Sequence, residues 1–371
     1  MEGINVIASS LITPLGDATE TLNAITNNIN AFKSYDKGLN IKNSKIALIK
    51  SDICDSDNYS SKLNKLAYKV GTTILDSIDN NILNERNIGL VFATSYGHLL
   101  DNEPSEGMSE WARRCTKALG FEEEPVVVST ACSAGSDAVG IACSMLEEDL
   151  YEAIIIIAVD IVTDAKRLAH SALGTMSTDI LKPFDIDRSG MLIGDGAAAL
   201  LLSKNEKLKS RARIIGYGAS NDATGLTTPD ITGKSVEMAI NRAIKSAAVQ
   251  LDDIAIYYAH GTGTKFNDQT ESLVINKLFN SNKDLKIVGT KGAIGHSLGA
   301  CGLIELILLI EILKNKKLVP TVGLEKPIDI VSDRFDLVND NRLKNNIGLT
   351  VTLGFGGFNT AIIVESGEVN D

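Results

Sequence analysis

A cysteine and two histidines, each in a segment rich in glycine, carry the residue types of a nucleophilic enzyme. Cys132 lies in STACSAG, His260 in YAHGTGT and His296 in TKGAIGHSLGA. A thiol can attack an electrophilic substrate, and an imidazole beside it can move a proton or stabilise charge. The three segments lie far apart in the chain, so they form one site only if a large fold brings them together.

Each of the three residues also has an ordinary structural explanation. Cys132 separates a strand pattern from a helical one, and a helix N-terminus would lower the pKa of its thiol, but small buried cysteines are common. His260 precedes a glycine-rich turn in which the hydroxyls of Thr262 and Thr264 could bind a phosphopantetheine-like arm, although histidines at strand ends are often plain surface residues. His296 repeats the arrangement of strand, glycine turn and histidine, which favours the catalytic interpretation.

Competing motifs are incomplete. Residues 233–235 resemble the end of a P-loop, but Thr228 stands where that motif requires a glycine. A metal site formed by His260, His296 and Asp268 is conceivable, but no paired ligand spacing supports it. We therefore expect no cofactor and no metal.

The composition is that of a globular enzyme with an acidic surface. Of the 371 residues, 44% are hydrophobic and 22% are charged, and the formal net charge is -11. This charge and the lack of a long basic run argue against nucleic acid as a partner. The five cysteines are irregularly spaced, which favours neither a disulfide framework nor a zinc cluster. Because no apolar run resembles a signal peptide or a membrane span, we expect a cytoplasmic protein without a membrane anchor.

Short apolar runs alternate with helical patterns, as is typical of an α/β protein. Runs without polar alternation predict strands buried on both faces. Beyond a first strand near the N-terminus, we expect strands at Ile88–Phe92, Val126–Val128, Ala153–Val159, Ala197–Leu202, Ile254–Tyr258, Ile347–Val351 and Thr360–Val364. We expect helices at Ala18–Asn30, Ser60–Ile78, Ser133–Leu150, Lys234–Gln250, Asp268–Phe279 and Leu298–Lys316.

A linker-like stretch, Lys204–Arg213, divides the chain into parts of similar make-up. On each side a strand leads through a tight turn with a reactive side chain into a helix of small residues: VVVSTACSAGSDAVGIACSM and KIVGTKGAIGHSLGACGLIEL. Small residues let two helices pack closely at the centre of a fold. Two interpretations remain open, a duplicated pair of halves or merely two closely packed helices.

Six motifs, in order, resemble those of β-ketoacyl-acyl carrier protein synthases of the elongating type, a family of the thiolase superfamily. They are TPLG at 13–16, TACSAG around Cys132, KPFDIDRSGMLIGDGAAALLL from Lys182, AHGTGTKFNDQTE from Ala259, GTKGAIGHSLGACGLIE from Gly289 and GFGGFN from Gly354. The resemblance covers nearly the whole chain. It implies a five-layer αβαβα thiolase-like fold of two similar halves, residues 1–205 with the nucleophilic cysteine and residues 206–371 with both histidines.

The resemblance also implies the reaction, a decarboxylative Claisen condensation in fatty-acid or polyketide biosynthesis. Cys132 would accept an acyl group from a thioester, and malonyl-carrier protein would then lose carbon dioxide and attack it. His260 and His296 would hydrogen-bond the thioester oxygen of the extender as negative charge develops there. The backbone amides of Cys132 and Phe355 would form the oxyanion hole for acyl transfer, and the Phe355 ring would act as a gate.

Further residues have supporting roles in this scheme. Lys291 and Glu271 would form the ion pair that orients the histidine loops, although a purely structural buried pair remains an alternative. Phe358 stands where the family commonly has a smaller Thr or Ser and could narrow the substrate pocket. The segment from Thr94 to Val126 is shorter than the family leads us to expect, so no acyl chain length follows.

The expected partners are acyl carrier protein, in acyl and malonyl forms, and a second subunit that makes a homodimer or a heterodimer. An acidic carrier needs a basic surface, for which the candidates are Lys62, Lys65, Lys69, Arg113, Arg114, Lys117 and the stretch 204–213. Two alternatives to the synthase remain: a ketosynthase-like acyltransferase, and a non-catalytic partner subunit of a ketosynthase heterodimer.

Overall fold

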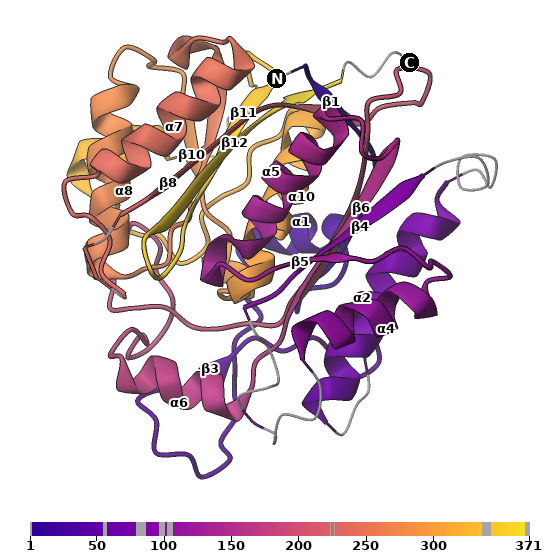
Figure 1. Cartoon of the computed structure of the whole chain (residues 1–371). Helices are drawn as coiled ribbons and strands as arrows, with labels where there is room; N and C mark the ends of the chain where they lie inside the picture. Colours follow the sequence, from indigo (N-terminus) through magenta and orange to yellow (C-terminus); the bar gives the residue numbers. More distant parts are fainter. Residues whose placement is uncertain are drawn as a thin grey trace.

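A computed structural model describes residues 2–54, 58–78, 87–95, 101, 107–222, 224–225, 227–335 and 343–367. His98 and parts of the segment between Thr94 and Val126 lie outside these residues. Within them, the helices and strands form layers that wrap around two central helices (Figure 1).

Ten strands hydrogen-bond in the order β10-β9-β11-β12-β8-β1-β7-β6-β4-β5, and a separate pair joins β2 to β3. Most of the ten are buried on both faces, as their unbroken apolar runs predict. Their bounds are β1 Ile4–Ile12, β4 Ile88–Ala93, β5 Val126–Val128, β6 Ala153–Asp160, β7 Gly196–Ser203, β8 Ala212–Asn221, β9 Ile254–Tyr258, β10 Lys286–Val288, β11 Ile347–Leu353 and β12 Phe358–Ser366, with β2 at Lys33–Ser34 and β3 at Lys45–Ile46.

The helices make up the remaining layers. In Figure 1, α5 and α10 lie between the two parts of the sheet, α7 and α8 cover one outer face, and α2 and α4 cover the other. Three apolar clusters match these interfaces, one around α5 and α10 and one beneath each outer pair. The helices span α1 Ala18–Thr26, α2 Tyr59–Asp76, α4 Met108–Ala118, α5 Ala134–Glu147, α6 Asp164–Ala172, α7 Lys234–Ala247, α8 Lys265–Leu278, α9 Lys291–Ile294 and α10 Cys301–Asn315.

The two halves of the sheet have the same topology. The five strands of the first half lie in the spatial order β5-β4-β6-β7-β1. Counted along the chain, these are the third, second, fourth, fifth and first strands of that half. The second half, β10-β9-β11-β12-β8, has the same order. The parallel and antiparallel pairings also correspond. The five-layer α/β fold of two similar halves is therefore confirmed, and the predicted limit between residues 205 and 206 falls in the connection from β7 to β8.

Two of the contacts between the halves lie in the sheet and at the centre of the fold. Strands β1 and β8 pair at one end only, where Ile4, Asn5 and Val6 face residues 214, 213 and 212. At the centre, α5 packs against α10 so closely that a Cβ atom added to Gly302 would lie 2.0 Å from the hydroxyl oxygen of Ser136. The small residues predicted to let these helices approach are thus required by the packing. No helix within the described ranges is long and apolar enough to cross a membrane.

Candidate active site

Cys132 lies in a tight turn that joins β5 to α5. Residues Ala131–Ser133 form a single 3-10 turn directly before the helix, and Ala131 has a positive φ of 52°. This left-handed conformation is uncommon for a residue with a side chain and lets the chain reverse within a few residues. The turn places the thiol inside the molecule, where Cys132 is 5% exposed.

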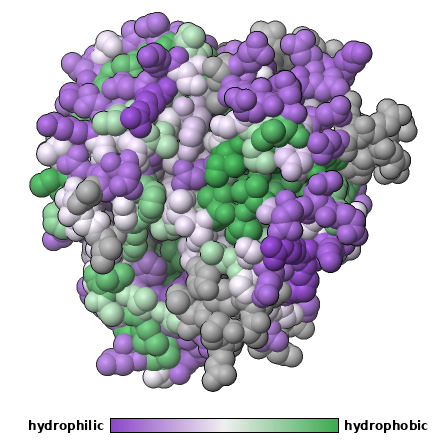
Figure 2. Space-filling view, in the orientation of Figure 1, coloured by the Kyte–Doolittle hydropathy of each residue, from purple (hydrophilic) through white to green (hydrophobic). Residues whose placement is uncertain are grey.

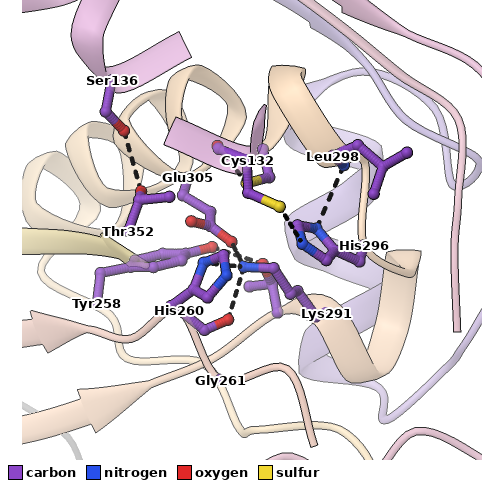
Figure 3. A network of polar contacts seen from close by, with 12 residues as sticks. Cys132, Ser136, Tyr258, His260, Gly261, Lys291, His296, Leu298, Glu305 and Thr352 are labelled. Atoms are coloured by element: carbon purple, nitrogen blue, oxygen red, sulfur yellow. Dashed lines mark hydrogen bonds and ion pairs between the residues drawn. The ribbon is translucent and has the colours of Figure 1, made fainter. Parts of the chain in front are cut away.

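His296 is in direct contact with this thiol. Its Nε2 atom lies 3.2 Å from Sγ of Cys132, and its Nδ1 atom accepts a hydrogen bond from the backbone N–H of Leu298 at 3.2 Å. Because Nδ1 accepts, the neutral ring carries its proton on Nε2. His296 therefore presents an N–H group to the sulfur, along the contact that is dashed in Figure 3.

His260 approaches the same place from the end of β9. The two imidazole rings stand edge to face, with centroids 5.1 Å apart. The Nζ atom of Lys291 lies 3.2 Å from Nδ1 of His260 and 2.6 Å from its carbonyl oxygen. An ammonium group can only donate, so Nδ1 of His260 is also an acceptor and its proton is also on Nε2.

Both rings are neutral donors. Burial holds the pKa of His260 and of His296 well below the usual range, and the nearby positive charge of Lys291 lowers both further. Two neutral imidazoles, fixed in the same tautomer by different partners, thus point N–H groups into one buried site.

Lys291 forms its ion pair with Glu305 of α10 (Figure 3). The predicted pair between Lys291 and Glu271 is therefore wrong. Burial lowers the pKa of Lys291, but Glu305, Cys301 and Glu271 together raise it, with Glu305 first among them, so the net pKa is raised and the amine stays charged. The physical reason is the position of the carboxylates, because Glu305 lies on the helix beneath the ammonium group whereas both oxygens of Glu271 are engaged elsewhere.

Glu271 holds the backbone of the His260 loop. Its carboxylate accepts hydrogen bonds from the backbone N–H of His260 at 2.9 Å and of Gly261 at 2.8 Å, and from the side-chain amide of Asn267 at 2.8 Å. Burial nevertheless raises the pKa of Glu271 to about 7. Glu271 thus holds the backbone of the loop in place through its hydrogen bonds.

Glu305 is a site residue that the sequence did not reveal. It appears there only as a charge within the apolar run 303–313, whereas in the fold it is 1% exposed and burial raises its pKa to about 7. The apolar helix that follows Lys291 and His296 holds two carboxylates, Glu305 and Glu311. The one near its start is the signal that could have identified Glu305, because buried charges are nearly always paired.

The thiol itself is not acidic in this setting. Burial raises the pKa of Cys132 to about 11, although Lys291 and a hydrogen bond from the backbone N–H of Phe355 lower it. The expected lowering by the helix N-terminus is therefore wrong for the substrate-free site, because loss of hydration outweighs the favourable charges. The thiol is therefore protonated at neutral pH.

Cys132, His260 and His296 also have the residue types of a metal-binding site. Sγ of Cys132 and one nitrogen each of His260 and His296 lie within 4.8 Å of one another, close enough to surround an ion. However, both Nε2 atoms carry protons and have no free lone pair, which a metal ligand needs. Asp268 is not available either, because it accepts from the backbone N–H of Gly263 and of Phe184. The donor set fits hydrogen-bond donation rather than metal binding.

A cavity of about 370 Å³ opens onto the three residues. Thr262 and Thr264 line it, with their hydroxyl oxygens 2.9 Å apart, and Phe355 lines it beside Cys132. The Phe355 ring lies 5.8 Å from the ring of His170, a contact that the sequence did not indicate. Phe358 is 39% exposed and is not among the lining residues, so the prediction that it narrows this cavity is wrong.

Several basic residues considered for carrier docking already have partners. Lys62 pairs with the buried Asp195 at 2.5 Å, and Arg113 pairs with Glu124 at 2.6 Å. Lys62 is thus part of the internal structure, and α2 is a weaker docking candidate than its row of lysines suggested.

Comparison with known proteins identifies the arrangement. Models of the β-ketoacyl synthase N-terminal and C-terminal domains match residues 106–207 and 211–325. A putative mitochondrial 3-oxoacyl-[acyl-carrier-protein] synthase of Schizosaccharomyces pombe is 30% identical over 333 residues, which is 83% of this chain and 76% of that protein. The alignments with several other curated relatives span less than two thirds of those proteins.

Solved structures share the fold over nearly the whole chain. The ketosynthase ApeO in complex with its chain length factor ApeC, from Xenorhabdus doucetiae, matches with a TM-score of 0.84 and 24% identity, covering 98% of each chain. AntDE:AntF, a type II PKS acyl-carrier protein in complex with its ketosynthase bound to the hexaketide, matches with a TM-score of 0.87 and 22% identity, covering 99% of each chain.

Proposed function

The chain belongs to the β-ketoacyl synthase family, and we propose that it is an acyltransferase that joins a Cys132-bound acyl group to a malonyl-type extender with loss of carbon dioxide. The observation that carries this proposal is the pair of neutral imidazoles that aim Nε2–H groups at the site of the thiol. Such donors stabilise an oxyanion without delivering a proton to the carbanion too early.

In the first step, the thiol of Cys132 attacks the carbonyl carbon of an acyl thioester. Its proton leaves as the carbon–sulfur bond forms. The carrier sulfur takes up that proton and departs from the tetrahedral intermediate as a thiol. The backbone N–H of Cys132 and that of Phe355, which already hydrogen-bonds the Cys132 thiol, would stabilise the oxyanion of that intermediate. Lys291 raises the local positive potential and favours developing negative charge on sulfur.

In the second step, the carboxylate of the bound extender leaves as carbon dioxide. The electron pair of the broken carbon–carbon bond passes to the thioester oxygen as an enolate, which would accept hydrogen bonds from His260 and His296. The α-carbon of the enolate then attacks the acyl group and expels the thiolate of Cys132. Thr262 and Thr264 would bind the arm that carries the extender, because their hydroxyls line the cavity that leads to the site.

An acyl carrier protein is the proposed donor of both substrates, and the structure of a similar ketosynthase in complex with its carrier supports this. The second subunit would be another copy or a related chain, as in the relative that pairs with a chain length factor. Figure 2 shows apolar residues gathered where Figure 1 places β5 and α5. From these two elements Val126, Val127, Ile141 and Met145 are only partly buried, which suits a subunit contact. A cytoplasmic location remains a prediction.

The test follows acylation and decarboxylation separately. The protein is incubated with an acyl-carrier protein and a malonyl-carrier protein, and the mass of the Cys132 peptide and the release of labelled carbon dioxide are recorded. His260→Ala should leave acylation within about twofold and lower decarboxylation by about 10²–10³, the loss found when one oxyanion donor is removed. Cys132→Ala serves as the control that cannot be acylated.

Three outcomes separate the alternatives. Acylation without carbon–carbon bond formation would show an acyltransferase of another kind. Absence of both events, alone and with a ketosynthase-like partner chain, would contradict a catalytic role. An equal loss of acylation and decarboxylation in His260→Ala would contradict the assigned division between the two steps.

A further inference from the structure

The turn that carries Cys132, residues 130–133, has a conformation that its own sequence does not favour. Ala131 has a left-handed φ of 52° although it is not a glycine. Neither the 3-10 turn nor the start of α5 has a side-chain cap from the residue that precedes it. Other groups must therefore hold this turn in place.

One carboxylate meets the hydroxyls on both sides of the nucleophile. The Thr130 hydroxyl lies 2.5 Å from Oδ2 of Asp137, and the Ser133 hydroxyl lies 2.7 Å from the same atom. Thr130 and Ser133 flank Cys132 on its two sides, so Asp137 ties both ends of the turn to the first turn of α5.

The second half of the chain anchors the same carboxylate. The phenol of Tyr217, on β8, donates to Oδ1 of Asp137 at 2.7 Å. The ring lies across α5 where that helix has no side chain, because a Cβ atom added to Gly140 would be 2.3 Å from Cζ of Tyr217. Burial and the charge of Asp137 raise the pKa of Tyr217, so the phenol keeps its proton and remains a donor.

Three hydroxyl groups thus converge on Asp137 from two halves of the chain. A carboxylate has enough lone pairs to accept all three, whereas an asparagine amide offers one acceptor oxygen and places donors where the other oxygen was. We infer that Asp137 is a positioning residue that fixes the Cys132 turn and, through Tyr217, sets it relative to the half that carries both histidines.

The inference rests on the proposed function only where acylation is measured. The distance of 3.2 Å between Sγ of Cys132 and Nε2 of His296 spans the two halves. Displacement of reacting groups by about 1 Å can lower a rate about a hundredfold. A loosened turn would therefore impair acylation and at the same time open the buried thiol to small reagents.

The experiment compares Asp137→Asn and Tyr217→Phe with Ser136→Ala. Ser136 is a matched control, because its hydroxyl also bonds across the halves, 3.0 Å from that of Thr352, without touching the Cys132 turn. Each full-length protein is treated with iodoacetamide at one pH, and mass spectrometry follows Cys132, Cys143 and Cys301 separately. Acylation by an acyl-carrier protein is measured in parallel.

In Asp137→Asn we expect acylation to fall about tenfold or more and alkylation of Cys132 to rise several-fold. Tyr217→Phe should show the same pattern with a smaller change, and Ser136→Ala should match the parent within about twofold. The buried thiol of Cys143 should stay protected in all three variants. Cys301 is a closer reporter of the turn, because its thiol lies 3.4 Å from the carbonyl oxygen of Cys132.

An equal rise in alkylation of all three cysteines would show a general loss of stability and overturn the inference. An unchanged alkylation rate of Cys132 in both Asp137→Asn and Tyr217→Phe would also overturn it. If Asp137→Asn does not fold, Tyr217→Phe and Thr130→Val test the same contacts. Failure of the parent protein to be acylated would contradict the proposed function alone, because the alkylation pattern would still decide the role of Asp137.

Discussion

The ammonium group of Lys291 lies 3.2 Å from Nδ1 of His260, and this one contact sets the chemistry of the imidazole. It fixes the tautomer with the proton on Nε2, and the charge of Lys291 adds to burial in lowering the pKa of the ring. Lys291 can do this only while Glu305 balances its charge within the core. The donor state of His260 therefore depends on Glu305, a carboxylate that does not line the cavity.

Glu305→Gln should abolish carbon dioxide release and lower the free energy of unfolding by about 3–5 kcal/mol, because it leaves a buried charge uncompensated. Glu311→Gln, on the same helix, is the control, since its pair with Arg211 is partly exposed and such pairs contribute about 0–1 kcal/mol. Urea unfolding and carbon dioxide release measure the two effects. Equal losses of stability and of carbon dioxide release in the two variants would argue against Glu305 as the residue that balances the charge of Lys291.

Alkylation of Cys132 in the substrate-free protein should lack a plateau near neutral pH. Only the thiolate reacts, and burial raises the pKa of this thiol to about 11. The rate constant with iodoacetamide should therefore rise about tenfold per pH unit between roughly pH 7 and 10. A plateau below about pH 9 would show that the free site stabilises the thiolate.

His170 should make the fold less stable in acid. Burial and the positive charge of Lys166 lower its pKa to about 4, while Asp160 opposes them. A histidine in an unfolded chain titrates near about 6.5, so unfolding takes up a proton between roughly pH 4 and 6.5. The free energy of unfolding then falls as the pH falls through this window.

His170→Gln removes that proton uptake while keeping a polar side chain near Thr175 and Phe355. The slope of the unfolding free energy against pH should become shallower by up to about 1.4 kcal/mol per pH unit between pH 4.5 and 6. Urea titrations at several pH values measure the slope. An unchanged slope would mean that His170 is protonated in the folded protein.

Gly302→Ala should destabilise the fold by about 1–3 kcal/mol, because the new methyl group would overlap Ser136 at the contact between α5 and α10. Gly107→Ala is the control, since a Cβ atom there has no neighbour within 4 Å among the residues that the structure describes and the backbone φ is -76°. Thermal and urea unfolding measure the stability of both variants relative to the parent protein. A neutral Gly302→Ala would show that the two helices can separate without cost.

Thr262→Val should raise KM for the carrier-bound extender about 3- to 10-fold with little change in kcat, as expected for loss of one hydrogen bond to the substrate. Phe358→Ser should leave both constants within about twofold, because Phe358 does not line the cavity. Steady-state kinetics over a range of extender concentrations measure the two variants. A larger effect of Phe358→Ser would place substrate outside the cavity described.

Local patterns in the sequence predicted the framework well. The apolar runs at 88–92, 126–128, 153–159 and 254–258 lie within or coincide with strands of the sheet. Such strands are easy to predict from sequence, because burial on both faces favours an unbroken run of apolar residues. Strand β8 was harder to recognise, since its glycines and alternating exposure resemble a turn-rich segment.

Pairings between distant residues were the part that the sequence did not determine. Glu271 and Glu305 are both buried carboxylates near Lys291, and motif order alone does not say which one receives the ammonium group. The pKa of Cys132 was mispredicted for a similar reason. The helix start is a local feature, but the burial that dominates the pKa depends on packing from the whole fold.

Strands β1 and β8 join the two halves along only three residue pairs, and the chain itself crosses between them once, from β7 to β8. The sulfur belongs to one side of that seam and both imidazoles belong to the other. A polypeptide cut between residues 203 and 212 would thus yield two fragments, each with a complete five-stranded framework and each chemically silent. Recovery of turnover on mixing them would measure how well the two fragments reassociate into the native arrangement.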